Sequence, residues 1–224
     1  MSSEDARVHI ESALLAFMEI YNSPYCYLLL APHIHRLLAY CSSLLNPAIP
    51  EGIRNAALEI LASTAELIPA ANQREYIPDY QEVSLRLLAM MTLVNSAEEN
   101  GHPNEDVFWE GDVDETDEED LKTYAVAESA LGRIAAAIGG RTVLDAIYGR
   151  VREMLDTNNA EWRQQHAAIS ALAALAEHCA KEYKQDLGGV TRLVLPMLQS
   201  QNYRLAYAGV YALAEFCETL EVRI

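Results

Sequence analysis

Four stretches of this 224-residue chain repeat one another in register, and this repeat restricts the fold more than any other feature of the sequence. Residues 163–177 align with residues 204–218 at an offset of 41, and both stretches begin with Arg and end with Glu. Residues 55–66 follow the same alignment, with Ala and Leu recurring at matched positions. Residues 130–131 fall in the same register more loosely. The chain is therefore expected to be built from stacked copies of one structural unit.

The length of the repeat predicts an all-α solenoid. A period of about 40 residues with two helices per unit is typical of HEAT and armadillo arrays. One helix pair cannot bury its apolar face alone, so neighbouring pairs stack and share a continuous core. We therefore expect a right-handed α-solenoid of HEAT repeats that forms a single array over residues 1–224. A globular helical bundle is the alternative, but a bundle does not require a 41-residue register.

Apolar periodicity and helix-stop signals divide the chain into about nine expected helices. Prolines and the pair Gly139-Gly140 mark several of the helix ends. No strand-like alternation is long enough to predict a sheet. The expected helices span residues 3–21, 25–45, 51–67, 75–95, 119–138, 142–155, 161–181, 183–198 and 203–220.

An acidic segment separates the fourth and fifth expected helices. Residues 98–120 hold 12 of the 33 Asp and Glu residues and no Lys or Arg, which concentrates most of the formal net charge of -17 there. Like charges repel one another and bury little apolar area, so we expect a disordered loop at residues 98–118. The alternative is an insertion that only aids solubility. The anions would speed the capture of a basic partner, and two aromatic residues suit an interface anchor. The candidate protein-binding residues are Glu105, Asp106, Phe108, Trp109, Glu110, Asp112, Asp114, Glu115, Asp117 and Glu118.

A second candidate site is a ridge of polar residues on the second helix of each repeat. Spacings of three and four place Glu59, Ser63 and Glu66 on one helix face. Matched positions on later helices would extend this ridge into an acidic ladder that suits basic protein segments, although Ala136 interrupts it. An ordinary solvated helix face is the alternative. The candidate residues of the ridge are Glu59, Glu66, Glu177, Tyr211, Glu215 and Glu218.

Single aromatic and basic residues on these helices are assigned structural roles. Trp162 is predicted to pack at a junction between repeats. Arg163 and Arg204 recur at matched positions and are predicted to pair with neighbouring Asp or Glu residues across the stack. His166 lies among alanines and is predicted to be a satisfied core residue.

No pattern of catalytic or ligand-binding residues is present, so we predict that the chain is not an enzyme. The sequence has no Gly-rich phosphate loop, no GxSxG motif and no HExxH motif. Asp112, Asp114 and Asp117 superficially suggest a calcium site, but their spacing does not match an EF-hand. His33 and His35 would point to different helix faces. We therefore predict no catalytic residue, no cofactor and no metal site.

Composition also excludes several classes of partner and location. No stretch approaches the roughly 18 uncharged apolar residues that span a bilayer, so we predict no membrane insertion. The residues from Met1 to Asp5 lack the basic region of a secretory signal. The four cysteines have no CxxC spacing and are predicted to be reduced core residues of a cytosolic or nuclear protein. The acidity argues against direct nucleic-acid binding and favours a basic protein partner.

Several motifs resemble a known family. The segment Val126-Ala-Glu-Ser-Ala-Leu131 is followed by Gly139-Gly140 and then by Glu161-Trp-Arg-Gln-Gln-His-Ala-Ala-Ile-Ser-Ala-Leu172. Tyr76-Ile-Pro precedes Leu88-Ala-Met-Met91 and a Trp-containing acidic loop. These segments resemble importin-β-type nuclear transport receptors (karyopherins), above all the importin-5 (Kap121-like) branch. The resemblance covers nearly the whole chain. Because family members are much longer, it implies an internal fragment or a truncated paralogue, with one leading B helix and four A–B pairs.

The resemblance implies a function. Such receptors bind cargo on the B-helix surface, release it when the Ran GTPase binds in its GTP form, and contact Phe-Gly repeats of the nuclear pore through their A helices. Importin-β itself carries an acidic loop within one central repeat, at a place equivalent to the loop here. Importin-α-type peptide grooves use a repeated Trp-x-x-x-Asn array, whereas this chain has one copy with His166 in place of Asn. We therefore reject an importin-α-like groove.

The predicted function is that of a transport receptor that shuttles between cytoplasm and nucleus. Its expected partners are basic protein cargo, a Ran-type GTPase and Phe-Gly repeats, bound through the solenoid and the acidic loop. An uncapped end of the array could also associate with itself. The alternative function is that of a HEAT-repeat scaffold or regulatory subunit outside nuclear transport.

Overall fold

The computed structural model describes residues 3–23, 25–94, 122–156 and 161–220. The acidic loop and all ten of its candidate residues lie outside these ranges. Every regular element within the ranges is helical. The α-helices are α1 (Ser3–Met18), α2 (Cys26–Leu30), α3 (Ile34–Leu44), α4 (Glu51–Leu67), α5 (Gln73–Met90), α7 (Thr123–Ile138), α8 (Gly140–Met154), α9 (Trp162–Ala174), α10 (Ala180–Gln185), α11 (Leu187–Val194) and α12 (Tyr203–Leu220). Short 3₁₀ helices are η1 (Glu19–Asn22), η2 (Ala31–His33), η5 (Glu177–Cys179) and η6 (Leu195–Gln199).

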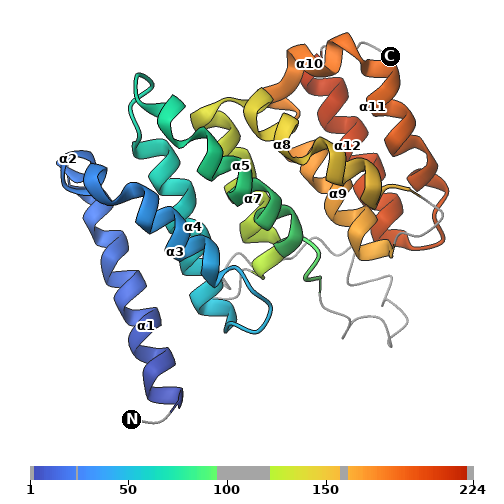
Figure 1. Cartoon of the computed structure of the whole chain (residues 1–224). Helices are drawn as coiled ribbons and strands as arrows, with labels where there is room; N and C mark the ends of the chain where they lie inside the picture. Colours follow the sequence, from blue (N-terminus) through green and yellow to red (C-terminus); the bar gives the residue numbers. More distant parts are fainter. Residues whose placement is uncertain (1–2, 24, 95–121, 157–160, 221–224) are drawn as a thin grey trace.

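The helices form two layers that run the length of the molecule (Figure 1). Helices α1, α4, α7, α9 and α12 pack side by side in chain order and form one layer, which we call the B layer. Helices α3, α5 and α8 pack in order in the second layer, the A layer, which α10, α11 and η6 continue. Each repeat therefore contributes one helix to each layer, as the 41-residue register predicts.

Small and apolar side chains at matched repeat positions lie in one continuous core. Ala56, Ala167 and Ala208 occupy matched positions on three B helices, and all three are buried. Their small side chains let neighbouring helices approach closely. Leu61 and Leu172 also match and are fully buried, and burying a Leu side chain contributes about 1.5–3 kcal/mol. The all-α HEAT solenoid predicted from the register is thus confirmed.

Two buried tyrosines tie the layers together by donating to the carbonyls of matched leucines. Tyr80 Oη donates a hydrogen bond to the carbonyl of Leu61 at 3.2 Å, and Tyr183 Oη donates to the carbonyl of Leu172 at 3.0 Å. Both phenols are almost completely buried. Each hydrogen bond joins an A-layer helix to the preceding B helix, and each satisfies a polar group that burial would otherwise leave unpaired.

The expected helix over residues 161–181 is shorter in the structure. Helix α9 ends at Ala174, and α10 begins only at Ala180. The backbone N–H of Ala176 bonds to the carbonyl of Ala173 rather than to that of Leu172, and the Leu172 carbonyl accepts from Tyr183. The α-helical hydrogen-bond pattern is interrupted here, and periodicity along the sequence does not reveal the interruption.

The described residues can be compared with the predictions on cysteines, membrane spans and metal sites. All four cysteines are free, and Cys26, Cys41 and Cys179 are buried, whereas Cys217 is partly exposed. None of the helices in the described ranges has the length and apolar character that crossing a bilayer requires. Across the same ranges, no group of three or more His, Cys, Asp or Glu residues is arranged to hold a metal ion.

Candidate protein-binding face on the B helices

The first part of the predicted acidic ridge is an ion-pair cluster within the protein. Arg133 Nη1 on α7 donates to both carboxylate oxygens of Glu59 on α4 at 2.7 Å. Arg133 Nε and Nη2 donate to Glu66 at 2.7 and 2.8 Å, and Nη2 reaches Ser63 Oγ at 3.2 Å. The hydrogen bonds from Arg133 lower the pKa of the Glu66 carboxyl. Glu59 and Glu66 therefore already have a cationic partner from the next repeat.

The later part of the ridge does not continue as a ladder along the helices. Glu177 is exposed, but it lies in η5, beyond the end of α9. Glu218 is exposed on α12, and the half-buried Glu215 hydrogen-bonds Tyr211. Because α9 ends early, Glu177 loses the helical spacing that would align it with Glu66 and Glu218. The expected ladder is therefore broken at its centre.

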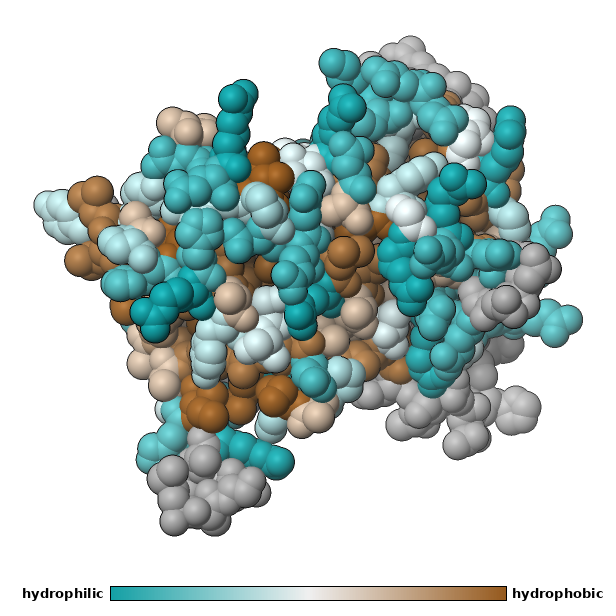
Figure 2. Space-filling model, in the orientation of Figure 1, coloured by the Kyte–Doolittle hydropathy of each residue, from teal (hydrophilic) through white to brown (hydrophobic). Residues whose placement is uncertain are grey.

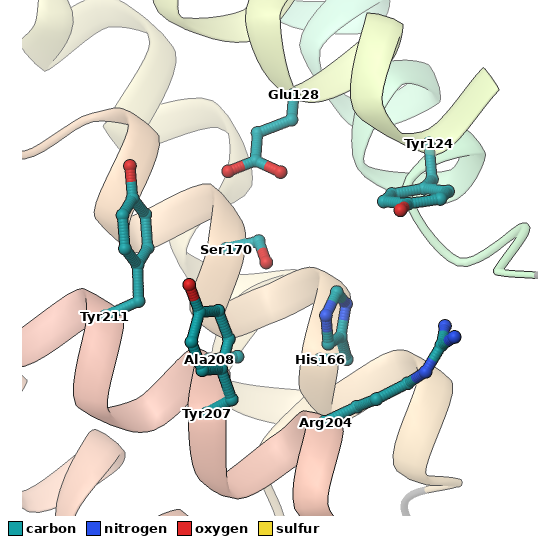
Figure 3. Close-up of a pocket in the computed structure, with 8 residues that line it drawn as sticks. All are labelled: Tyr124, Glu128, His166, Ser170, Arg204, Tyr207, Ala208 and Tyr211. Atoms are coloured by element: carbon teal, nitrogen blue, oxygen red, sulfur yellow. The ribbon is translucent and has the colours of Figure 1, made fainter. Parts of the chain in front are cut away.

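A hollow opens on the B layer between α7, α9 and α12 (Figure 3). Its volume is about 370 Å³. Six of its eight lining residues lie in the aligned stretches 163–177 and 204–218. The residues that line this B-face hollow are Tyr124, Glu128, His166, Ser170, Arg204, Tyr207, Ala208 and Tyr211.

Glu128 provides the carboxylate of the B-face hollow. Figure 3 shows its side chain reaching from α7 into the hollow. Burial raises the pKa of the Glu128 carboxyl to about 7, since a charged form loses solvation there. Among the described residues, no group forms a hydrogen bond or ion pair with this carboxylate. Glu128 is therefore a desolvated carboxyl without a hydrogen-bond or ion-pair partner among the described residues.

His166 lies opposite Glu128 and corrects the prediction of a satisfied core residue. Its Nδ1 atom is buried and has no hydrogen-bond partner in the described part of the chain. Burial lowers the pKa of the imidazole, which favours the neutral ring. The rings of Tyr124 and Trp162 meet the imidazole edge-on, with centroid distances of 6.5 and 6.4 Å. His166 is thus held by aromatic contacts and lines the B-face hollow.

The two recurring arginines have different environments. Arg163 stacks over Trp162 at 4.8 Å and pairs with Glu161 at 3.1 Å. Its Nε also donates to the carbonyl of Val94 near the end of α5 at 3.2 Å, so it spans a repeat junction. Arg204 lines the B-face hollow instead, and burial lowers the pKa of its guanidinium. Arg163 therefore has a structural role at a repeat junction, and Arg204 forms part of the wall of the B-face hollow.

Sequence reasoning missed Tyr124, Glu128 and Tyr207 as members of a site. One signal could have found Glu128, because its matched position 41 residues later holds the buried Ile169. A carboxylate at a repeat position that is otherwise apolar costs stability, so it is a candidate for a role in binding. Tyr207 matches His166 in the same register, so two repeats contribute a polar ring to one face.

Two other recesses and a polar cluster lie outside the B-face hollow. A hollow of about 260 Å³ lies between α8 and the α10–α11 segment, and Tyr148 and Glu182 are among its residues. A second, of about 390 Å³, lies between α1 and α3 and is mainly apolar. His35 pairs with Asp79 at 2.8 Å and with Glu75 at 3.4 Å, and these carboxylates raise the pKa of its imidazole.

The chain is similar in sequence and in fold to importin-type proteins. An importin-repeat family model matches residues 46–145. Importin subunit beta-3 of Saccharomyces cerevisiae is 28% identical over 162 residues, which is 72% of this chain and 14% of that protein. The crystal structure of Kap121p bound to Nup53p superposes with a TM-score of 0.76 and 22% identity, and it covers 98% of this chain and 20% of that one. For Kap121p bound to RanGTP the TM-score is 0.74 at 23% identity, over 94% of this chain and 20% of that one.

The two layers of stacked helices define a HEAT-repeat solenoid. The importin-repeat match over residues 46–145 and the similarity to importin subunit beta-3 then support a fragment of a karyopherin of the importin-β type. The chain spans about a fifth or less of the length of these relatives.

Proposed function

We propose that this chain is part of a nuclear transport receptor and binds basic segments of cargo proteins on its B-helix face. The observation that carries this proposal is the B-face hollow, in which the carboxylate of Glu128 has no cationic partner among the described residues. Leaving an anion desolvated costs stability. A cationic side chain from a partner would relieve that cost at the site.

The relatives support this proposal. Kap121p has been crystallised bound to Pho4p, to Ste12p, to Nup53p and to RanGTP. Those complexes describe Kap121p, and by analogy we propose that this chain takes part in binding cargo and a Ran-type GTPase. In this proposal the receptor moves between cytoplasm and nucleus, and its activity consists of binding without bond chemistry.

The acidic segment fits the same proposal. Its 12 carboxylates would attract a basic partner over a long range and raise the rate of encounter. Solvent-exposed charges are screened by salt, with a Debye length of about 8 Å at physiological ionic strength. The contribution of the segment should therefore fall as salt is added, whereas contacts within the B-face hollow should change less.

Two further partners are proposed for other surfaces. Exposed apolar side chains on α2 and at its N-cap, namely Leu28, Leu29 and Tyr25, suit Phe-Gly repeats. The α1–α3 end exposes more large apolar side chains, and in Figure 2 brown residues gather over this end of the molecule. We propose that this end can contact a second copy of the chain. Sedimentation at rising protein concentration tests that contact, and a constant monomer mass would argue against it.

The test of the main proposal is a titration with a Lys- and Arg-rich import-signal peptide, followed by fluorescence anisotropy at low and physiological salt. The intact chain is compared with a chain that lacks residues 104–120. We expect saturable binding to both, with weaker binding to the deleted chain at low salt. A matched peptide with Glu in place of each basic residue serves as the control.

The outcomes separate the two candidate functions. Loss of binding on deletion would move the site to the acidic segment. Absence of binding at both salt concentrations would favour the alternative, a HEAT scaffold outside nuclear transport. Displacement of bound peptide by a Ran-type GTPase in its GTP form, but not in its GDP form, would distinguish a transport receptor from such a scaffold.

A further inference from the structure

We propose that the last B helix, α12, binds the α1–α3 end of a second copy of the chain, so that copies stack head to tail and extend the array. This inference deepens the contact between copies proposed above and rests on it, because it names the surface of the second copy that takes part. It does not depend on cargo binding, since the residues that carry it do not line the B-face hollow.

One position of the repeat faces the following B helix. A Cβ added at Gly132 of α7 would lie 3.5 Å from the carbonyl oxygen of Ala174, so this position faces α9. The 41-residue register matches Gly132 with Ala173 on α9 and with Ala214 on α12, and Ala62 on α4 falls in the same register. Ala62 is fully buried and Ala173 is 4% exposed, because α7 and α12 pack beside these helices. Ala214 is exposed, and no B helix among the described residues follows α12.

The residues beside Ala214 extend this uncovered face. Positions four residues before it and three residues after it lie on the same side of a helix. On α9 the matched positions hold Ile169 and Ala176, and both are fully buried. On α12 they hold Val210, which is 59% exposed, and Cys217, which is partly exposed. Val210, Ala214 and Cys217, which we call the outer face of α12, therefore form an apolar surface of the kind that the next helix covers on α9.

The opposite end of the array presents a second uncovered apolar surface. Helices α1 and α3 are the first B helix and the first A helix in the described ranges, and α1 and α12 lie at opposite ends of the B layer (Figure 1). The recess between α1 and α3 has a volume of about 390 Å³ and is mainly apolar, with Ile10, Ala13 and Phe17 among its residues. Helix α1 also exposes Val8 and Leu15. An apolar side chain projecting from another helix would be accommodated there.

A second copy of the chain suits both surfaces at once. Head-to-tail stacking would place α12 of one copy beside α1 of the next, where an interior B helix has its preceding neighbour. The outer face of α12 holds no charged residue, and His9 and Tyr40 are the titratable residues that line the recess. The contact therefore does not require the burial of an unpaired carboxylate or ammonium. Since two different surfaces meet, the contact is heterologous and produces an open series of copies.

Salt should strengthen this contact. Each copy carries a formal net charge of -17, so copies repel one another at low ionic strength. Added salt screens that repulsion, whereas the contact itself is apolar and loses little. Capture of a basic peptide by the acidic segment should respond in the opposite direction. The sign of the salt dependence therefore separates contact between copies from cargo binding.

The experiment is sedimentation velocity at rising protein concentration, at physiological and at high salt. The mass of the wild type should rise with concentration beyond that of a dimer. Val210→Glu changes the outer face of α12, and Ala13→Glu changes the α1–α3 recess. Each change should weaken association by about tenfold or more, because a carboxylate would be buried without a partner. Leu85→Glu, at an exposed position of the interior helix α5, is the matched control and should associate as the wild type does.

Mixing the two variants tests the head-to-tail arrangement itself. Each variant keeps the end that the other lacks, so an equimolar mixture of Val210→Glu and Ala13→Glu should form a dimer with one copy of each, although neither associates alone. A mixture that stays monomeric would contradict the arrangement. Circular dichroism checks the helix content of each variant. Ala214→Glu, a second exposed position on the outer face of α12, replaces Val210→Glu should that variant lose helix.

Two further outcomes would overturn the inference. If Val210→Glu associates as the wild type does while Ala13→Glu does not, the α1–α3 end contacts another surface. The inference is then refuted, and the proposed contact between copies stands. A wild type that stays monomeric at every protein and salt concentration refutes both, and the peptide titration then decides on cargo binding independently.

Discussion

Two charged residues of α7 show how the environment, rather than residue type, decides what a charge does. Arg133 and Glu128 lie on the same helix, yet Arg133 bonds two carboxylates of α4, whereas Glu128 faces the B-face hollow and forms no ion pair with a described residue. The first pair of interactions ties two repeats together. The carboxyl of Glu128, in contrast, has lost its hydration, and a polar group of a partner could take the place of the lost water. One B helix therefore carries a structural contact and a candidate binding residue on different faces.

The Glu128 carboxyl should make stability depend on pH. Its folded pKa of about 7 lies above the unfolded value of about 4.3, so the folded state binds the proton more tightly. Its contribution is favourable below the unfolded pKa and is lost as the pH rises through about 7. Glu128→Gln should therefore raise the free energy of unfolding by about 1–2 kcal/mol at pH 8 and change it little at pH 5. Urea unfolding at both pH values tests this, and an equal effect at both would contradict it.

Arg133→Met should destabilise the fold by about 1–2 kcal/mol at pH 7, since Glu59 and Glu66 would lose a shared cationic donor. The partial exposure of all three groups keeps this estimate low. The Glu66 pKa is depressed in the folded state. The contribution of Glu66 to stability is therefore present above the unfolded pKa and is lost as the pH falls through the folded pKa. Arg133→Met should flatten that acid dependence. Arg150→Met, which removes an exposed pair on α8, should cost less than about 0.5 kcal/mol.

The sequence did not predict that Arg133 pairs with α4 or that Glu128 lines a hollow. The partners of Arg133 lie 67 and 74 residues earlier in the chain, so no local spacing reveals them. Glu59 and Glu66 were correctly placed on one helix face, but helical spacing does not show which neighbour covers that face. His166 was misinterpreted for a related reason, because the alanines around it describe only its own helix.

At the scale of elements, the junction of α7 and α8 depends on two adjacent glycines. Gly139 has a φ of 103°, a backbone conformation that favours glycine. This matches the helix end predicted from the Gly-Gly pair. Gly140 has a different role, because a Cβ there would lie 2.2 Å from the carbonyl oxygen of His178. The close approach lets η5 pack on α8 and positions the return of the chain after α9.

Replacing Gly140 by Ala should therefore destabilise the protein by about 2–4 kcal/mol, since backbone atoms must move to accept the methyl group. Gly149 lies within the same helix, and an added Cβ there meets nothing within 4 Å. Gly149→Ala should stabilise the protein by about 0.5–1 kcal/mol through helix propensity. Thermal and urea unfolding of both variants provide the comparison, and equal effects would show that the close approach does not matter.

Over the whole molecule, packing contacts run mainly between neighbouring repeats. Helices α4 and α7 each pack against B helices on both sides, whereas α1 and α12 have a B-helix neighbour on one side in this chain. Stability in such arrays is approximately a sum of repeat terms and nearest-neighbour interface terms. The interior of the array should therefore open less often than its ends.

Hydrogen exchange should show this gradient. We expect the strongest protection of backbone amides in α4 and α7 and the weakest in α1 and α12, because the inner helices lose two interfaces on opening. Mass-spectrometric exchange of the intact chain resolves these segments. Uniform protection across all B helices would indicate instead that the array opens as one cooperative unit.

The sequence by itself determined the class of fold and the order of the helices. A 41-residue register of Ala and Leu can be satisfied by stacked helix pairs, and the buried Ala56, Ala167 and Ala208 meet that requirement in the structure. The tertiary structure alone decided which charges are paired and where the layer is hollowed. Those properties depend on side chains from helices tens of residues apart, as at Arg133 and in the B-face hollow, because packing between repeats brings them together while periodicity describes each helix separately.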